Sequence, residues 1–308
     1  MENTTELSQI VASTRRSPTR EALRHLLRHS SGRAGLIILG LLILIAIFAP
    51  VIAPYNPTQI LRESKRRTPP CIHILGCPAD QPEHLFGVDG NTRDLFSRVI
   101  FGSRLSLQIG IATMAFAILI GTLIGAVSAY AGGWLDNLLM RIMDVLMAFP
   151  SLLLAIAIVS ILGTGLINAL LAIGIVSIPR FARLVRSTVL TVKDLEFVQA
   201  SRAMGASGLH ILFKRILPNA VTPLIVQGTL GIATAILDAA ALSFLGLGAE
   251  PPRPEWGLML GEEKNSIFSA PHLVIFPGIA IMLTVLGFNL LGDGMRDTLD
   301  PRLTRAGK

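Results

Sequence analysis

The chain has 308 residues, of which 51% are hydrophobic and only 15% are charged. A soluble domain cannot bury so much apolar side chain, so the composition excludes an ordinary soluble protein and predicts a polytopic protein in contact with membrane lipid. We attribute the formal net charge of +7 to membrane topology, and we expect no nucleic-acid partner.

Six apolar stretches are long enough to span a membrane. A bilayer core of about 30 Å requires about 20 helical residues, and each stretch meets that length. In lipid every segment must satisfy its own backbone hydrogen bonds, which favours helices. We therefore expect an all-α membrane protein with six transmembrane helices, covering roughly residues 35–54, 104–128, 138–162, 166–188, 220–246 and 272–293.

The distribution of Lys and Arg predicts the orientation of these helices. With the amino terminus inside, the inner segments hold twice as many of these residues as the outer loops. Because Lys and Arg accumulate on the cytoplasmic side, we expect both termini in the cytoplasm, as tails over residues 1–34 and 296–308. The first apolar run begins too far along the chain for a cleaved signal peptide, and we interpret it as an uncleaved signal anchor.

The largest outer segment covers residues 55–103 and contains Cys71 and Cys77 in the stretch TPPCIHILGCP. On the oxidising side of a membrane, two cysteines in a tight loop bounded by prolines favour a disulfide. Free thiols, or a metal site completed by His73, are the alternatives. Further on, TRDLFSRVIFG has apolar residues on one helical side, which predicts a short amphipathic helix at the outer interface.

Two carboxylates, Asp144 and Asp238, fall within predicted spans. Ionisable side chains are costly in a span, so both residues are candidates for a substrate path. Asp144 lies near the inner end of its span, one turn from Arg141, and an ion pair at the interface is its alternative role. Asp238 lies deeper, in the stretch AILDAAALSF, and its alternative role is packing.

The loop over residues 189–219 runs through a charged, amphipathic stretch, EFVQASRAMGASGLHILFKRILPNAV. Its periodicity predicts two short helices, with Gly205 ending the first and Ser207 capping the second. Pro218 then fits the first turn of the next span. A loop that only reconnects two spans needs few residues, so we expect a folded cytoplasmic foot that docks a partner. A foot that packs only against its own bundle is the alternative.

This stretch resembles the EAA loop in permease subunits of bacterial ATP-binding-cassette (ABC) importers. That loop reads Glu-Ala-Ala, three residues, Gly, nine residues, then Ile-x-Leu-Pro. Here Gln199 replaces the Glu, Ser201 the second Ala and Arg215 the Ile, and the Gln removes a charge that could have paired with a basic partner residue. The resemblance implies contacts with ATPase subunits at Gln199, Ala200, Ser201, Gly205, Leu217 and Pro218.

Four further stretches resemble the peptide and nickel branch of this family: FGVDGNTRDLFSRVIFGSRLSL, AYAGGWLDNLLMRIMDVLMAFPSLLLAI, LSFLGLGAEPPRPEWGLML and FNLLGDGMRDTLDPRL. The resemblance covers nearly the whole chain from about residue 35, and it is strongest to dipeptide permeases of the second-subunit type. It implies the permease fold of type I importers, with a core over residues 104–295.

The prolines of GAEPPRPEWG forbid a helix, so this stretch is expected to be an outer loop. In the family such loops face the external binding protein, and the resemblance therefore implies contacts at Glu255 and Trp256. Anchoring of Trp256 at the membrane–water interface is the alternative.

The resemblance also implies the partners: a homologous permease in a heterodimer, two ATP-binding subunits and an extracytoplasmic substrate-binding protein, all at the bacterial inner membrane. The chain has no G-x-x-x-x-G-K-[ST] phosphate loop and no zinc-ligand pair. We therefore expect a transporter subunit that is not an enzyme and holds no cofactor or metal, with ATP and Mg bound by its partners.

Dipeptides are the expected cargo, with nickel, glutathione and oligopeptides as alternatives. A stand-alone secondary transporter is the rival interpretation. Such proteins show internal repeats and several intramembrane charges, and the sequence has no clear repeat and few such charges.

Overall fold

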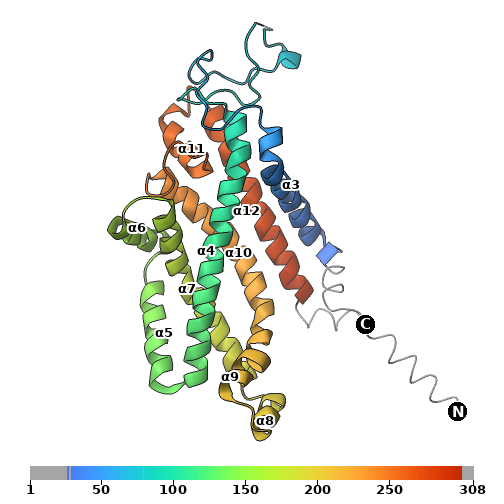
Figure 1. Cartoon of the computed structure of the whole chain (residues 1–308), viewed down its shortest axis with the longest axis vertical. Helices are drawn as coiled ribbons and strands as arrows, with labels where there is room; N and C mark the ends of the chain where they lie inside the picture. Colours follow the sequence, from blue (N-terminus) through green and yellow to red (C-terminus); the bar gives the residue numbers. More distant parts are fainter. Residues whose placement is uncertain (1–25, 28, 79, 300–308) are drawn as a thin grey trace, which may run out of the picture.

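The computed structural model describes residues 26–27, 29–78 and 80–299 (Figure 1). The predicted tails over residues 1–34 and 296–308 lie largely outside them. In the described part of the chain the regular structure is helical, apart from two isolated β-bridges. The long helices are α3 (Ser30–Ile52), α4 (Leu95–Ala131), α7 (Leu166–Val192), α10 (Val221–Phe244) and α12 (His272–Leu299). The shorter α-helices are α5 (Gly133–Met147), α6 (Ser151–Leu162), α8 (Glu196–Ala203), α9 (Gly208–Ile211) and α11 (Trp256–Glu263).

Five helices within the described residues are long and apolar enough to cross a membrane, and a bent pair brings the number of candidate spans to six. The bent pair occupies the third predicted span, residues 138–162, which is therefore two helices and not one continuous helix. α5 and α6 meet at an angle of 96°. Pro150 precedes α6 and has no N–H with which to continue the hydrogen bonds of α5.

The second span begins earlier than predicted. The stretch interpreted as a separate amphipathic helix forms the first turns of α4, which runs unbroken for 37 residues. The Asp94 side chain accepts a hydrogen bond from Ser97 N at 2.8 Å and so caps the helix. The outer segment therefore ends at Asp94 and not at residue 103. At the other end of the chain, α12 continues past residue 296, where the tail was expected to start.

The long helices lie side by side and connect two distinct ends of the molecule (Figure 1). α4 packs along α7, and α12 packs along both α3 and α10. One end carries the segments over residues 53–94 and 245–271, which we call the outer cap. The other end carries residues 193–220, which we call the foot. The cap and the foot are thus separated by the length of the helical bundle.

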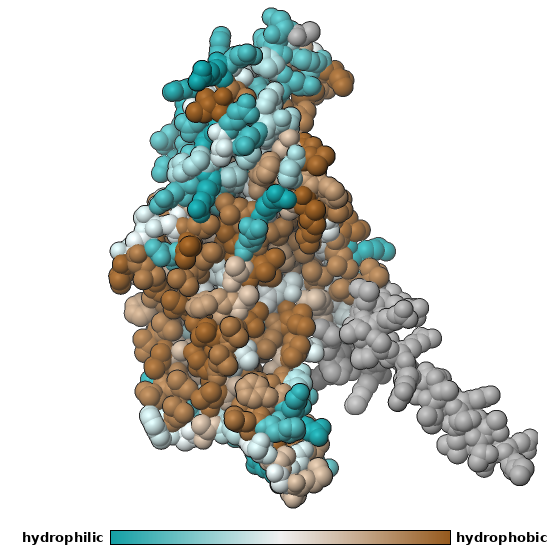
Figure 2. Space-filling model, in the orientation of Figure 1, coloured by the Kyte–Doolittle hydropathy of each residue, from teal (hydrophilic) through white to brown (hydrophobic). Residues whose placement is uncertain are grey.

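The surface divides in the same way. On the face seen in Figure 2, broad hydrophobic surface covers the long helices, with hydrophilic surface on the outer cap and at the foot. Many large apolar side chains of the spans are exposed, among them Ile47, Leu119, Leu153 and Met282. A broad apolar surface of this kind is what a lipid bilayer covers.

Candidate functional site

The foot begins with α8 and turns sharply at Gly205, whose φ of +80° lies in the left-handed region. Glycine adopts this conformation without a steric penalty, so it ends the first helix as predicted. The Ser207 side chain accepts a hydrogen bond from His210 N and caps α9. The predicted end of the first helix and start of the second are both confirmed.

The rest of the foot is less regular than the predicted second helix. α9 ends at Ile211, a π-helical turn covers Leu212–Ile216, and a 3-10 turn covers Leu217–Ala220 before α10 begins. Pro218 therefore lies in the 3-10 turn and not in the first turn of α10. Its missing N–H interrupts the α-helical hydrogen bonds at this point.

One face of the foot is buried against the ends of α4 and α7. Val198 of α8 and Ile216 of the π-helical turn are both fully buried there, and Ile211 is 1% exposed. They pack in one cluster with Ala126, Ala129, Val185, Val189 and Val192 of the two long helices. The foot is therefore close-packed against the ends of both long helices.

The opposite face of the foot exposes apolar side chains. Met204 is 77% exposed, Leu209 69% and Phe213 55%, and the basic residues Arg202 and Lys214 beside them are also exposed. Exposed apolar residues rimmed by charge on a folded segment are typical of a protein–protein contact. The foot can therefore bind a partner without disturbing its own packing.

The six residues expected to contact ATPase subunits divide between these two faces. Ser201 is buried, and its Oγ donates to the Phe197 carbonyl at 2.8 Å. Leu217 is half-buried, and the four exposed residues are Gln199, Ala200, Gly205 and Pro218. Ser201 thus helps to pack the foot, while the exposed residues are free to meet a partner.

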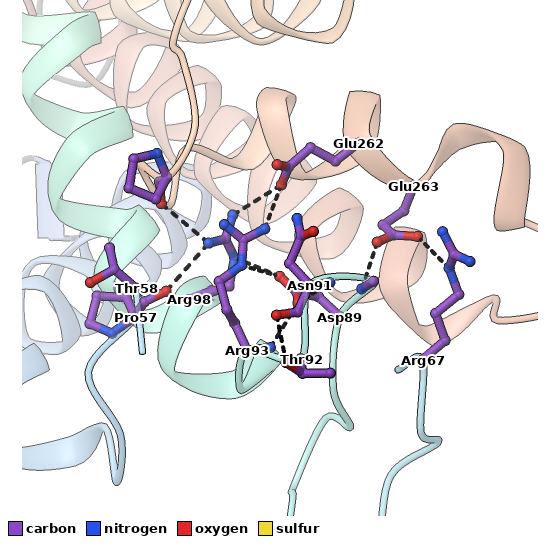
Figure 3. Close-up of polar contacts among 12 residues, drawn as sticks. Pro57, Thr58, Arg67, Asp89, Asn91, Thr92, Arg93, Arg98, Glu262 and Glu263 are labelled. Atoms are coloured by element: carbon purple, nitrogen blue, oxygen red, sulfur yellow. Dashed lines mark hydrogen bonds and ion pairs between the residues drawn. The ribbon is translucent and has the colours of Figure 1, made fainter. Parts of the chain in front are cut away.

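At the opposite end of the molecule, four charged side chains interlock in what we call the outer clamp: Asp89, Arg93, Arg98 and Glu262 (Figure 3). Arg93 pairs with Asp89 at 2.7 Å and with Glu262 at 2.9 Å. Arg98 lies 3.4 Å from Asp89 and 3.2 Å from Glu262. Two positive and two negative groups balance, as burial of charge requires. The clamp therefore ties the start of α4 to α11.

Two additional sets of contacts fasten the same parts of the cap (Figure 3). Arg98, 1% exposed, also donates to the carbonyl oxygens of Pro57 and Pro252 at 3.3 Å each. Glu263 of α11 accepts hydrogen bonds from Arg67 Nε at 3.0 Å and from Gly90 N at 2.7 Å. These contacts therefore join the two segments of the outer cap to each other and to the start of α4.

Sequence reasoning did not identify the outer clamp. Its one local signal is the i,i+4 spacing of Asp89 and Arg93, which is too common to single out. Glu262 is 164 residues from Arg98 in the chain, so no sequence pattern brings them together. Only the folded arrangement of α4 and α11 reveals the pairing.

Glu255 and Trp256 do not lie at the surface of this chain, contrary to the expectation that they contact an external protein. They are 2% and 1% exposed. The Glu255 carboxylate accepts hydrogen bonds from Gly257 N at 2.9 Å and Leu258 N at 2.7 Å and caps α11, while its burial raises its pKa above the ordinary value. Trp256 Nε1 donates to the Val99 carbonyl at 3.0 Å. Both residues hold α11 against α4.

The two candidate carboxylates of the spans have different surroundings. Asp144 is exposed and pairs with Arg183 of α7, not with the expected Arg141. Asp238 is half-buried in α10. A third carboxylate, Asp136 of α5, went unnoticed in the sequence. It is 9% exposed and accepts two hydrogen bonds from Arg186 at 2.6 Å each, which join α5 to α7.

Cys71 and Cys77 are bonded to each other. Of the three alternatives that the sequence left open, the structure has the disulfide, and a metal site that includes these two thiolates is excluded. Within residues 26–27, 29–78 and 80–299, no group of three His, Cys, Asp or Glu side chains could hold a metal ion.

Comparison with known proteins identifies relatives over most of the chain. Residues 117–305 match the family described as "Binding-protein-dependent transport system inner membrane component", and residues 17–70 match the "N-terminal TM domain of oligopeptide transport permease C". The chain is 50% identical to the dipeptide transport system permease protein DppC of Alkalihalophilus pseudofirmus, with 93% of this chain and 91% of that protein covered. It is 47% identical to the glutathione transport system permease protein GsiD of Pectobacterium atrosepticum, with 94% and 92% covered.

A solved structure shares the fold. Chains of the MetNI methionine ABC transporter, in inward-facing conformations, superpose with a TM-score of 0.55 at 21% identity, covering 67% of this chain and 98% of that one. Identity this low supports an argument about the fold alone. The predicted permease fold is confirmed by this likeness together with the five to six candidate spans.

Proposed function

The chain belongs to the peptide and nickel family of ABC importer permeases, of the type found in oligopeptide permease C, and we propose that it carries dipeptides across the cell membrane. It is a multi-pass inner-membrane subunit and not itself an enzyme, because in this family ATP is bound by partner subunits. The finer proposals below concern its cargo, its coupling surface and its path.

The foot is the surface proposed to couple the chain to an ATPase subunit. This proposal rests on the two different faces of the foot. One face packs on α4 and α7, and the other exposes the apolar side chains of Met204, Leu209 and Phe213. Closure of an ATPase pair against the exposed face would move the foot, and the packed face would tilt the two long helices. ATP supplies the free energy, and this chain converts it into a change of access to the path.

The proposed assembly has two permeases, two ATPase subunits and one external binding protein. The substrate path lies between this chain and a second, homologous permease, which makes a heterodimer. Asp238 is proposed to line that path, since a half-buried carboxylate in a span suits the ammonium group of a peptide. Normal uptake and assembly in the Asp238→Asn variant would leave this residue with a packing role only.

Dipeptides are favoured as cargo by the name of one relative at 50% identity. A glutathione permease at 47% identity supports a second candidate, glutathione, which is itself a short peptide with free charged ends. Uptake of a labelled dipeptide by cells that have or lack this chain, with unlabelled glutathione as competitor, separates the two. Dipeptide uptake that depends on the chain and resists glutathione is the expected result, and the reverse pattern would assign glutathione.

The coupling role is tested by purifying the chain in mild detergent with its bound subunits. Leu209→Asp and Phe213→Asp place charge on the exposed face of the foot without touching its buried face. We expect both variants to fold but to lose the ATPase subunits. Phe268→Asp, at a 99% exposed apolar position of the outer cap, is the matched control that keeps them. A chain that purifies alone and still mediates uptake would instead favour a secondary transporter.

A further inference from the structure

α7 carries three arginines, each three residues from the next, and they differ in their partners. Arg183 pairs with Asp144 and Arg186 pairs with Asp136, both carboxylates of α5. Arg180 lies near the middle of α7 and is exposed, and it forms no ion pair with another described residue. Because an unpaired cation within a span is costly in lipid, we expect an anionic group from outside the described chain to meet it.

The opposite charge lies on the helix that packs beside α7. A Cβ atom at Gly231 of α10 would lie 3.5 Å from Phe181 Cζ of α7, so the two helices touch next to Arg180. Asp238 lies on the same face of α10 as Gly231, two turns or about 11 Å further along the helix. Its carboxylate is half-buried and close enough to Arg180 to be attracted by it. The two side chains nevertheless form no ion pair with each other.

The directions of the two helices turn these side chains toward each other. α7 begins at the outer cap, where Gly165 N donates to the Leu247 carbonyl, whereas α10 begins at the foot (Figure 1). Side chains of a helix lean toward its amino-terminal end, so Arg180 leans outward and Asp238 leans inward. An extended dipeptide is about 7 Å long, and with a hydrogen bond of about 3 Å at each end it spans a distance of this order.

Polar side chains line the interval between the two charges. Ser177 lies one turn outward from Arg180, and Thr234 lies one turn inward from Asp238. Both hydroxyls donate to carbonyl oxygens of their own helix, at 2.8 Å each, and Thr234 is exposed. Polar and charged side chains within spans face a bundle interior or a water-filled cavity rather than lipid. This strip of α7 and α10 therefore suits the wall of a path.

We propose that Arg180 and Asp238 form two subsites for the charged ends of a peptide, with the guanidinium binding the terminal carboxylate and the Asp238 carboxylate binding the terminal ammonium. The inference rests on the proposed function, which supplies the peptide cargo and the role of Asp238. It goes further by assigning Arg180 and by requiring both ends of the cargo to be free. Guanidinium groups bind carboxylates through two parallel hydrogen bonds, so a bound peptide satisfies both charges of the wall.

The test uses the complete transporter reconstituted in liposomes, with ATP on the side of the foot and the dipeptide-binding protein of the same cell on the other side. The binding protein is saturated in turn with a labelled dipeptide, with the same dipeptide amidated at its carboxyl end, and with the same dipeptide acetylated at its amino end. Saturation removes the preference of the binding protein from the comparison. Uptake of each peptide per transporter is then measured.

We expect the wild-type transporter to take up the free dipeptide at least tenfold faster than either blocked peptide. Arg180→Gln should slow the free dipeptide to the rate of the amidated one and leave the rate of the amidated one unchanged. Asp238→Asn should do the same with respect to the acetylated peptide. Arg180→Lys keeps the charge and should keep the preference for a free carboxyl end.

The matched control is Arg183→Gln, which removes the neighbouring arginine and its ion pair with Asp144 and should keep the wild-type ratio of the three rates. If Arg180→Gln slows all three peptides by one factor, or slows none of them, the inference is overturned and Arg180 is an anchor at the membrane. Loss of the second permease from purified Arg180→Gln also overturns it, since the arginine would then pair with that subunit. A wild-type transporter that takes up none of the three peptides overturns the proposed dipeptide cargo itself.

Discussion

The two arginines of the outer clamp differ sharply from Arg67 in their surroundings, although all three pair with carboxylates of α11. Arg98 is 1% exposed, whereas the Arg67 side chain is 46% exposed. Loss of one partner from a buried pair leaves an uncompensated charge and costs about 3–5 kcal/mol. Exposed pairs contribute at most about 1 kcal/mol.

We therefore expect Arg98→Met to lower the free energy of unfolding by about 3–5 kcal/mol. Arg67→Met should lower it by less, because Arg67 is half in water and the buried Glu263 keeps its hydrogen bond from Gly90 N. Denaturant titration of the purified chain in detergent micelles, followed by loss of helical signal, measures both values. Equal losses in the two variants would mean that the outer clamp is solvated and contributes no more than a surface ion pair.

At the scale of elements, the contact between α4 and α7 depends on a glycine. A Cβ atom at Gly125 would collide with the Ala182 carbonyl oxygen of α7. The backbone of α7 cannot move aside without disturbing the cluster that anchors the foot, which includes Ala126, Val185 and Val189. The close approach of these helices therefore also fixes the attachment of the foot.

Gly125→Ala should destabilise the chain by about 1–3 kcal/mol, the usual cost of overpacking, and should weaken retention of the ATPase subunits. Gly40→Ala in α3, where a Cβ would meet nothing within 4 Å, is the control and should remain close to wild type. Thermal unfolding in detergent and co-purification of the ATPase subunits report the two effects. A Gly125→Ala variant as stable as Gly40→Ala would show that α4 and α7 separate readily.

At the scale of the whole molecule, the cap and the foot occupy opposite ends of the bundle (Figure 1), and the Lys and Arg distribution predicts that the foot lies in the cytoplasm. Both ends expose side chains that suit labelling, Phe268 at 99% and Met204 at 77%. Single cysteines at these positions can be compared directly, because Cys71 and Cys77 are bonded to each other and react with no maleimide.

A membrane-impermeant maleimide should label Phe268→Cys in intact cells and Met204→Cys only after the inner membrane is permeabilised. The wild-type chain should stay unlabelled in both conditions unless a reductant is added. Labelling of Met204→Cys in intact cells would reverse the orientation and would remove the foot as a surface for cytoplasmic ATPase subunits.

The sequence alone determined the features that depend on local chemistry. Hydropathy predicted the membrane spans, because the length of an apolar run is set by the thickness of the bilayer. Glycine and serine predicted the turn and the cap in the foot, which the structure confirms at Gly205 and Ser207, because these residues act on their own backbone neighbourhood. The sequence also favoured the disulfide between Cys71 and Cys77, because the two lie in a tight loop bounded by prolines, although free thiols and a metal site stayed open until the structure showed the bond.

Only the tertiary structure decided which groups meet across long stretches of chain. Hydropathy did not predict the bend between α5 and α6. Both helices are apolar, and the hydropathy of a segment contains no information about the angle between consecutive helices. Glu255 and Trp256 follow a proline-rich stretch that looks exposed. Glu255 nevertheless caps α11, and Trp256, the first residue of that helix, bonds to Val99 of α4, so both are buried. The outer clamp joins residues 164 and 169 positions apart, and such pairs form only when folding brings the start of α4 against α11, a placement that no local pattern encodes.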